Sequence, residues 1–254
     1  MSHPEQLAFI AACVEANRDL VDGGSVLEVG SYDVNGSVRS VFAAARRYVG
    51  VDLVEGPGVD IVAAGKDVEA PDASFDVTVS GECFEHDPDW RETLRAMVRL
   101  TRPGGLVIVT CASRGRVEHG TRRTTATESP GTQSLGLDYY RNVSIDDVKS
   151  LPLVEWFDQH LLVHAPRAAD LYLCGVRRGR GEAPSGTLPD EASVSAAADL
   201  MSPVDRAVRL PLRAMAFGIR DEARFQAVAT RYWRLLLLVG AAARRLRRPR
   251  GSSA

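Results

Sequence analysis

Short apolar segments alternate with polar loops and helical stretches through the first 112 residues of the chain, and this alternation limits the folds that it can adopt. Apolar residues at helical spacing occupy 4–21 and 88–100, and a further helical stretch ends near Arg46. Parallel neighbouring strands need a crossover connection, which is usually helical. The apolar segments predicted as strands are 26–30, 48–54, 59–64, 75–82 and 104–112. The pattern therefore predicts an α/β fold with a doubly wound, Rossmann-like sheet.

Two later segments, 153–164 and 170–178, complete a sheet of about seven strands, mostly parallel with an antiparallel edge strand. Between the fifth strand and these two lies a polar stretch, 113–143, without sustained periodicity. We expect it to form a long loop over the carboxyl edge of the sheet, where long loops usually serve function.

Composition divides the chain into three parts. Residues 1–178 carry the strand and helix pattern and form the predicted main domain, while 179–202 are rich in Gly, Ala, Ser, Pro and Glu and are expected to be a flexible linker. Residues 203–254 form a tail whose segment 224–248 is a basic amphipathic helix. Twelve Arg, no Lys and three acidic residues follow Met201, so this end carries +9 against −11 for the rest.

The charge distribution bears on possible partners. The acidic body disfavours a nucleic-acid enzyme, because Lys and Arg contacts to phosphate dominate that affinity. The longest unbroken apolar run in the tail, 235–243, is too short to span a bilayer, which takes about 20 residues. The tail is therefore expected to contact a membrane surface as a peripheral helix, to self-associate, or to pack on the acidic body.

The first residues and the cysteines indicate the compartment. The chain starts without a basic lead followed by an apolar run, so we expect a cytoplasmic protein, with peripheral contact at the inner membrane face if the tail binds lipid. The four cysteines, 13, 83, 111 and 174, have spacings that match neither a metal-ligand pair nor a disulfide scaffold. They are expected to be reduced thiols.

The first strand and its neighbour carry the main ligand signal. Gly30 ends the first strand, and Asp52 lies at the end of the second, so both fall on the crevice at the carboxyl ends of the strands. Tyr32 and Asn35 replace the second and third glycines of the dinucleotide fingerprint, which disfavours a nicotinamide-dependent reductase. Asp52 can accept hydrogen bonds from a ribose diol, and Glu28 suits a cationic amino group. This pattern favours a ligand that is an amino-acid-like nucleoside. The alternative is a tight strand-to-helix turn with an ordinary surface aspartate, which would give the same sequence pattern.

Residues from about 20 to 178 resemble class I S-adenosylmethionine-dependent methyltransferases. The likeness rests on Glu28-x-Gly30, on the acid that ends the second strand, and on the segments PDASFDVTVSGECFEH and RLTRPGGLVIVT, all in the order of that family. It implies that S-adenosylmethionine is the cofactor, with Gly30 and Ser31 at its methionine part, Asp52 at the ribose hydroxyls and Glu28 holding the loop or meeting the amino group. It further implies that Ala64, Gly65 and Asp67 lie at the adenine, although Ala64 stands where the family commonly has aspartate.

The segment SGECFEHDPDW, residues 80–90, would lie beneath the transferable methyl group in this family. By its position at the strand tip, Glu82 is expected on the cofactor side. Glu85 and His86 offer a carboxylate and an imidazole for a divalent cation, for which we consider Mg²⁺, and His86 could also act as a general base. The alternative is that His86 serves loop structure by bonding to backbone while Asp87 caps the following helix.

Histidines outside this segment divide by position. His119 follows the fifth strand, where this family places substrate and catalytic groups, so we expect it to be the leading general base, with an exposed loop histidine as the alternative. His160 and His164 lie in or beside a late strand and are expected to be structural, and His3 is expected to be disordered.

The long loop indicates the acceptor. Arg116, Tyr139 and Tyr140 provide donors and stackable rings, which suit a sugar or an oligosaccharide better than a fatty chain. The phrases TCASRGRVEHGT and GLDYYRN also resemble actinobacterial saccharide O-methyltransferases, including those of methylated mannose polysaccharides. The sequence thus predicts methyl transfer to a hydroxyl of a sugar, glycoside or polysaccharide precursor. The alternatives are a natural-product aglycone hydroxyl or amine as acceptor, or a methyltransferase-like scaffold without turnover.

Overall fold

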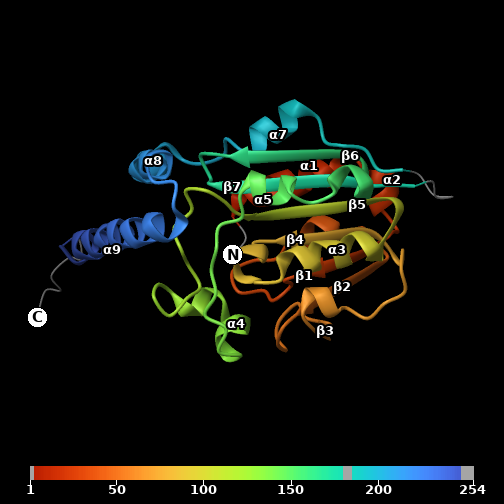
Figure 1. The fold of residues 1–254 in the computed structure, drawn as a ribbon, viewed down its shortest axis with the longest axis horizontal. Helices are drawn as coiled ribbons and strands as arrows, with labels where there is room; N and C mark the ends of the chain where they lie inside the picture. The colour runs from red at the N-terminus through yellow and green to blue at the C-terminus, as the bar shows by residue number, and fades with distance from the viewer. Residues whose placement is uncertain (1–2, 180–184, 247–254) are drawn as a thin grey trace, which may run out of the picture.

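One seven-stranded sheet forms the centre of the molecule (Figure 1). The structure, a computed structural model, describes residues 3–179 and 185–246, with side chains to 238. The strand order is β3-β2-β1-β4-β5-β7-β6, with β7 antiparallel to both its neighbours and the other pairs parallel. The strands are β1 Ser25–Val29, β2 Arg47–Asp52, β3 Ile61–Val62, β4 Phe75–Gly81, β5 Thr101–Ala112, β6 Phe157–Ala165 and β7 Asp170–Arg177. The predicted Rossmann-like fold is confirmed, but the antiparallel strand is not at the edge: β7 lies one place in, between β5 and the edge strand β6.

Helices cover both faces of the sheet. The described α-helices are α1 Pro4–Glu15, α2 Arg18–Val21, α3 Trp90–Leu100, α4 Pro130–Ser134, α5 Ile145–Lys149, α6 Leu153–Trp156, α7 Glu191–Ala197, α8 Pro203–Gly218 and α9 Glu222–Leu246. The described 3₁₀ turns are η1 Val38–Phe42, η2 Gly65–Asp67, η3 Phe84–His86 and η4 Ala126–Glu128.

Two hydrophobic cores lie on opposite faces of the sheet, because successive strand residues point to opposite sides. Val26 packs with α1, η1 and α7 on one face, whereas Leu27 packs with α3, α5 and α6 on the other. Every residue of β1 is buried, as expected for a central parallel strand covered on both faces. The chain runs outward from β1 to β3 and then returns to β4 on the other side of β1. This reversal creates a crevice at the carboxyl ends of β1 and β4.

Three of the expected elements differ in extent. The helix expected over 4–21 is interrupted at Asn17, whose side-chain amide donates to the carbonyl oxygen of Cys13 at 2.7 Å. The helical stretch expected before Arg46 is only the short turn η1, and the segment expected as a strand from 153 begins with the single turn α6. All four cysteines are free, as expected.

The segment expected as a flexible linker is folded over part of its length, and residues 180–184 lie outside the described part. Thr187 donates its backbone N–H to the side-chain oxygen of Asn17 at 2.7 Å. Helix α7 then packs on α1, with Val194 and Ala197 buried in the core on that side. The expectation of a linker is therefore wrong for 185–202, because this stretch covers one face of the main domain.

The C-terminal helices α8 and α9 stand beside the end of the sheet (Figure 1). Leu212 and Ala216 of α8 pack on Phe225 and Ala229 of α9 in a separate small core, which also contacts Val117 in the loop after β5. Among the described residues, no helix combines the length and apolar character needed to cross a membrane. We call the pair α8 and α9 the C-terminal hairpin. This hairpin thus packs against the loop that follows β5.

Candidate active site

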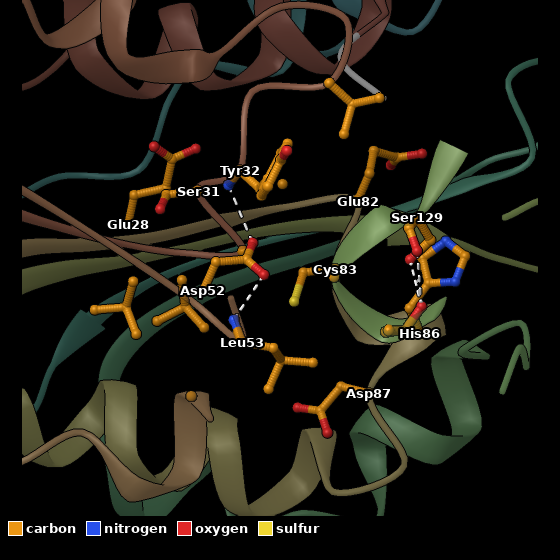
Figure 2. A pocket seen from close by; sticks show the side chains of 18 of the residues that line it. Glu28, Ser31, Tyr32, Asp52, Leu53, Glu82, Cys83, His86, Asp87 and Ser129 are labelled. Atoms are coloured by element: carbon orange, nitrogen blue, oxygen red, sulfur yellow. Dashed lines mark hydrogen bonds between the residues drawn. The ribbon is translucent and has the colours of Figure 1, made fainter. Parts of the chain in front are cut away.

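A deep pocket opens at the crevice between β1 and β4 (Figure 2). Its walls come from the strand ends, from the turn after β4 and from the segment around α4. Seven of the eight residues expected at the cofactor line this pocket, namely Glu28, Gly30, Ser31, Asp52, Ala64, Gly65 and Glu82. The eighth, Asp67, is exposed and does not line it. The expectation for Asp67 therefore fails, because the turn η2 directs its side chain to solvent.

Gly30 shapes the floor of the pocket. Its φ of +84° lies in the left-handed region, and a Cβ atom there would come within 2.6 Å of the Cβ of Cys83. The backbone N–H groups of Gly30 and Ser31 both donate to the carbonyl oxygen of Val51, at 2.9 and 3.1 Å. Only glycine fits this position without strain. The role of Cys83 that the structure shows is packing under the turn.

Asp52 faces the pocket from the end of β2. Its carboxylate accepts hydrogen bonds from the backbone N–H groups of Tyr32 at 3.0 Å and Leu53 at 2.7 Å (Figure 2). Burial raises the pKa of Asp52, and these two bonds oppose that rise. Each carboxylate oxygen has a second lone pair, so the side chain can still accept hydrogen bonds from a ligand diol.

Glu28 lies deeper in the pocket wall. Its carboxylate accepts a hydrogen bond from the hydroxyl of Tyr48 at 2.7 Å. Burial raises the pKa of Glu28 to about 7, and the bond from Tyr48 opposes that rise. An incoming ammonium group would favour the charged carboxylate.

The long loop after β5 supplies another wall of the pocket. Ser129, Gly131 and Thr132, in and before α4, line it, and a Cβ atom on Gly131 would lie 3.0 Å from Oδ1 of Asp52. The sequence placed this segment in a long functional loop without identifying these residues. Gly131 lies 79 positions from Asp52 along the chain, so no local sequence signal indicates that the two are close in space.

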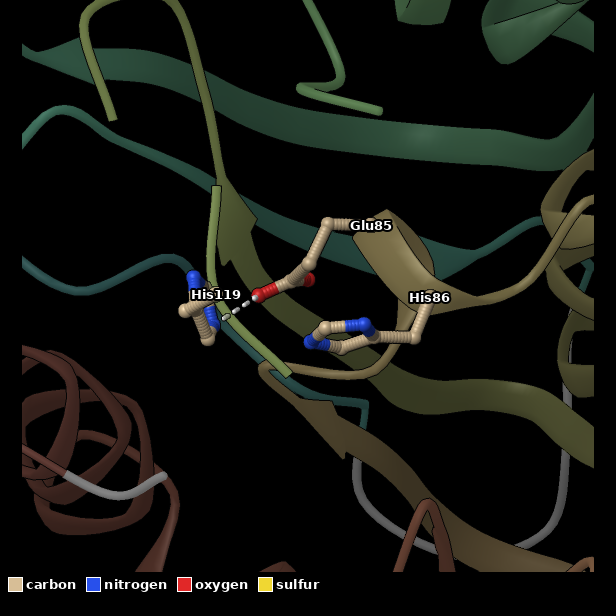
Figure 3. Close-up of side chains that lie close together, drawn as sticks. All are labelled: Glu85, His86 and His119. Atoms are coloured by element: carbon tan, nitrogen blue, oxygen red, sulfur yellow. Dashed lines mark ion pairs between the residues drawn. The ribbon is translucent and has the colours of Figure 1, made fainter. Parts of the chain in front are cut away.

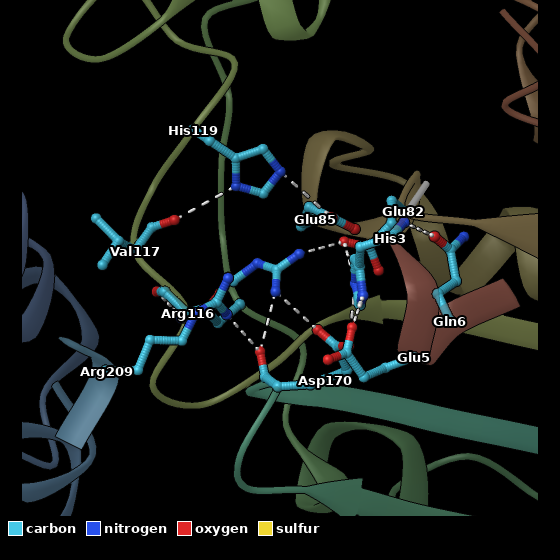
Figure 4. Close-up of polar contacts among 12 residues, drawn as sticks. His3, Glu5, Gln6, Glu82, Glu85, Arg116, Val117, His119, Asp170 and Arg209 are labelled. Atoms are coloured by element: carbon cyan, nitrogen blue, oxygen red, sulfur yellow. Dashed lines mark hydrogen bonds and ion pairs between the residues drawn. The ribbon is translucent and has the colours of Figure 1, made fainter. Parts of the chain in front are cut away.

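Glu82 lines the pocket and also belongs to a buried charge network (Figure 4). Its φ is +54°, an uncommon backbone conformation for a residue with a side chain. Arg116 donates to Oε2 of Glu82 at 2.8 Å and lies 3.3 Å from Oδ1 of Asp170. Burial raises the pKa of Glu82, but the Arg116 guanidinium and His3 outweigh it and hold the pKa well below its usual range. Arg116, expected to bind substrate, is thus largely committed to two carboxylates.

His3 completes this network and is ordered, contrary to expectation. Its ring nitrogens lie 3.0 Å from Glu5, 3.6 Å from Glu82 and 3.1 Å from Asp170. Burial opposes the charged imidazole, but hydrogen bonds to these carboxylates outweigh it and raise the pKa of His3 to about 11. The cationic imidazole therefore holds the start of the chain against the site.

Glu85, His86 and His119 lie close together beside the pocket (Figure 3). Nε2 of His119 lies 3.8 Å from Oε1 of Glu85, and its Nδ1 lies 3.3 Å from the carbonyl oxygen of Val117. Burial raises the pKa of Glu85 to about 8, lowers that of His86 to about 4 and lowers that of His119 well below its usual range. Burial therefore favours the neutral form of both imidazoles.

Tyr140 joins the two histidines in a ring cluster. Its ring lies 5.4 Å from that of His86 and 5.0 Å from that of His119, edge to face. Its hydroxyl donates to the side-chain oxygen of Asn142 at 2.9 Å. Tyr139 is half-buried and its ring takes no part in this cluster.

Of the other predicted positions, Asp87 accepts a hydrogen bond from the backbone N–H of Asp89, which agrees with a structural role.

A second cavity, of about 430 Å³, opens on the far side of this cluster, and this size is within the usual range for small-molecule sites. Glu128 lines both cavities, His86 lines the first and His119 the second. The wall of the second cavity comes partly from the loop after β5 and partly from the C-terminal helices. Those helices contribute Asp205, Arg209, Leu212, Trp233, Arg234 and Leu237.

The sequence comparison identifies the segment that carries the first pocket. Residues 27–109 match the family described as a methyltransferase domain. An uncharacterized methyltransferase from Mycobacterium sp. (strain JLS) is 34% identical over 116 residues, which cover 40% of this chain. The chain spans 44% of that relative's length.

Solved structures with a similar fold include methyltransferases. One is 1,6-didemethyltoxoflavin-N1-methyltransferase from Burkholderia thailandensis, with bound S-adenosylhomocysteine, which is 17% identical over 68% of this chain and 80% of its own, at a TM-score of 0.47. Another is the YcgJ protein from Bacillus subtilis, 13% identical over 70% of this chain and all of its own, at a TM-score of 0.48.

The strand order and the family match agree on one class of protein. Residues 27–109 supply β1 to β4 and most of β5, the strands whose carboxyl ends form the first pocket. This part of the chain is therefore similar to a methyltransferase domain.

Proposed function

We propose that the protein transfers a methyl group from S-adenosylmethionine to a hydroxyl group of a sugar, glycoside or polysaccharide precursor. The observation that carries the cofactor assignment is the pocket between β1 and β4, in which the Gly30 turn and the Asp52 carboxylate face the same space. The match of 27–109 to a methyltransferase domain supports it. In this assignment Asp52 accepts the ribose hydroxyls and Glu28 faces the amino group of the methionine part.

In this proposal the methyl group is transferred where the two cavities adjoin. The acceptor oxygen attacks the methyl carbon, the carbon–sulfur bond breaks, and the sulfonium becomes the neutral sulfur of S-adenosylhomocysteine. The hydroxyl loses its proton in this step. In this proposal His119, which lines the second cavity, takes that proton on Nε2, which lies 3.8 Å from Oε1 of Glu85. Alignment of the two reactants supplies much of the remaining rate enhancement.

The lining of the second cavity supports a polyhydroxylated acceptor. It combines charged side chains such as Glu118, Asp205 and Arg209 with the ring of Trp233. Charged and hydroxyl side chains suit the hydroxyls of a sugar, and an indole ring suits the apolar face of a pyranose. Val117, Leu212 and Leu237 make part of the same lining apolar, and this feature favours a natural-product aglycone hydroxyl as the second candidate acceptor.

The test is methyl transfer from S-adenosylmethionine labelled at the methyl group. Purified protein is incubated with mannose- and glucose-based oligosaccharides, with phenolic aglycones and with amines. The proposal expects label on a saccharide hydroxyl and none on the amines. Turnover with aglycones or amines alone would overturn the acceptor class, and absence of turnover across a broad panel would favour a scaffold role.

Exposed apolar side chains on α8 and α9 support contact with an anionic lipid surface as part of this proposal. Phe217, Leu235 and Leu238 are 89%, 59% and 68% exposed, and arginines such as Arg231 flank them. Apolar burial and attraction of Arg to anionic headgroups both favour such binding. Co-sedimentation with anionic vesicles but not with neutral ones is the expected result, and it would favour a lipid-linked glycan as acceptor.

A further inference from the structure

The carboxylate of Glu85 is buried without a hydrogen-bond donor. Glu85 is 0% exposed, and no other described residue hydrogen-bonds either of its oxygens. Nδ1 of His86 is likewise buried and unpartnered within the described part of the chain. One atom from each of Glu85, His86 and His119 lies within 4.8 Å of the others (Figure 3). Buried polar groups without partners are costly, so this arrangement calls for a ligand that satisfies several lone pairs together.

A second cluster of carboxylates and an imidazole differs from the Glu85 cluster because it already contains a cationic side chain. Glu82, Asp170 and His3 also lie within ligating distance of one another, but Arg116 donates to Glu82 and pairs with Asp170. Arg116 thus already supplies a cation to both carboxylates of that group. No described Lys or Arg forms an ion pair with Glu85, whose ion-pair contact is with His119.

The orientation of His119 fits a metal ligand. Its Nδ1 lies 3.3 Å from the carbonyl oxygen of Val117, an acceptor, so the proton belongs on Nδ1 and the lone pair on Nε2. Backbone carbonyls commonly hold metal-binding imidazoles in this way. The Nε2 lone pair faces Oε1 of Glu85 across 3.8 Å. Two metal–ligand bonds of about 2.1 Å can bridge this distance.

We propose that Glu85, His86 and His119 bind one divalent transition-metal ion, with Zn²⁺ as the reference ion. Two imidazoles and one carboxylate are the donors that Zn²⁺ and Fe²⁺ accept, and three protein ligands leave further positions for water or substrate. Mg²⁺, considered from the sequence, prefers oxygen ligands and is a poorer match once His119 joins the set.

The place of the ion gives it a role in the reaction, and this role rests on the proposed function. His86 lines the cofactor pocket and His119 the second cavity, so an ion between them adjoins both. An acceptor hydroxyl bound to the ion would have a lowered pKa. With the ion present, His119 is a ligand, and the proton passes to water in the second cavity as the oxygen attacks the methyl carbon. With the ion absent, His119 is the proton acceptor.

The first test measures binding of Zn²⁺ alone to untagged, metal-depleted full-length protein by isothermal titration, with Co²⁺ absorption as the spectroscopic readout. Glu85→Gln and His119→Ala are each expected to weaken binding at least tenfold and to change the visible Co²⁺ spectrum. His160→Ala, in β6, is the matched control and should bind as the parent protein does. Equal binding in all four proteins, or no stoichiometric binding in the parent, overturns the site.

A second measurement does not depend on the variants folding. X-ray absorption at the zinc edge of the parent protein should show imidazole and carboxylate donors, and a purely oxygen or sulfur shell contradicts the assignment. S-adenosylmethionine affinity is measured in parallel. If the cofactor binds and methyl transfer continues at full rate after metal removal, the catalytic role of the ion fails while the proposed function stands. If the ion binds but the cofactor does not, the metal site stands and the proposed function fails.

Discussion

The side-chain oxygen of Gln226 in α9 accepts a hydrogen bond from the backbone N–H of Glu118 at 2.8 Å, in a buried contact between residues 108 positions apart. The amide nitrogen of the same side chain donates to the carbonyl oxygen of Arg116 at 2.9 Å. One glutamine thus satisfies two backbone groups of the loop that carries His119. The C-terminal hairpin thereby becomes part of the wall of the second cavity.

Replacement of this glutamine tests that coupling. Gln226→Leu leaves the backbone N–H of Glu118 without this partner, which costs about 1–3 kcal/mol, while the carbonyl oxygen of Arg116 still accepts a hydrogen bond from the Asn142 side chain. We expect a higher KM for the acceptor and an unchanged Kd for S-adenosylmethionine, measured by steady-state kinetics and titration. Arg231→Gln, on the exposed side of the same helix, is the control. A change in cofactor affinity without a change in acceptor KM would refute the assignment of this wall to the acceptor.

The turn at Gly30 predicts a stability difference between two glycine substitutions. Gly30→Ala and Gly23→Ala both place a side chain at positive φ, which costs about 1–2 kcal/mol. No heavy atom lies within 4 Å of a Cβ on Gly23, whereas a Cβ on Gly30 overlaps Cys83. Such overlap costs about 1–3 kcal/mol more. Urea denaturation should therefore show the larger loss for Gly30→Ala, and equal losses would contradict the described turn.

Arg116 predicts a second stability effect. Arg116→Met leaves the buried carboxylates of Glu82 and Asp170 without their main cation, and breaking such a buried ion pair costs about 3–5 kcal/mol. The loss should be smaller at pH 4 than at pH 7, because unpaired buried carboxylates take up protons more readily. Chemical denaturation at both pH values measures this loss in the free energy of unfolding. Arg122→Met, at an exposed position of the same loop, should change the free energy of unfolding little.

The raised pKa of His3 predicts a loss of stability on the alkaline side. A pKa of about 11 in the folded protein, against an ordinary value of 6.5, means that the charged imidazole stabilises the fold fully below pH 6.5. This contribution decreases as the pH rises from 6.5 toward 11. The free-energy difference between the parent and His3→Gln should thus shrink between pH 6 and pH 10 in thermal or urea unfolding. A difference that stays constant with pH would show that His3 is not charged in the folded state.

Local patterns predicted the strands and the cofactor-side turn. Buried segments such as 26–30 combine apolar residues with a terminal glycine, and the acid at Asp52 follows at the distance that the fold requires. These features depend on near neighbours in the sequence and on the handedness of strand connections. The same reasoning identified the segment that carries Glu85 and His86. It did not predict that His119 lies beside these two residues.

Features that depend on distant contacts were not predictable. The order of His3 comes from the carboxylates of Glu82 and Asp170. Arg116 lines the second cavity, but its guanidinium also pairs with these two carboxylates. The helix α7 carries too few apolar residues to be recognised alone and is held by α1. Each depends on charge or burial supplied from another part of the chain, which spacing along the sequence does not reveal.

Titration of the protein with S-adenosylmethionine and S-adenosylhomocysteine, alongside Asp52→Ala and Asp67→Ala, tests the central claim most directly. A hydrogen bond to a charged group contributes about 1.5–3 kcal/mol, so loss of the Asp52 carboxylate should weaken binding roughly 10- to 150-fold. Asp67 lies outside the pocket, so its replacement should leave affinity unchanged. Binding by the parent that falls in Asp52→Ala alone is the predicted result. Absence of binding at millimolar cofactor, or equal binding in all three proteins, would contradict the assignment of this pocket to S-adenosylmethionine.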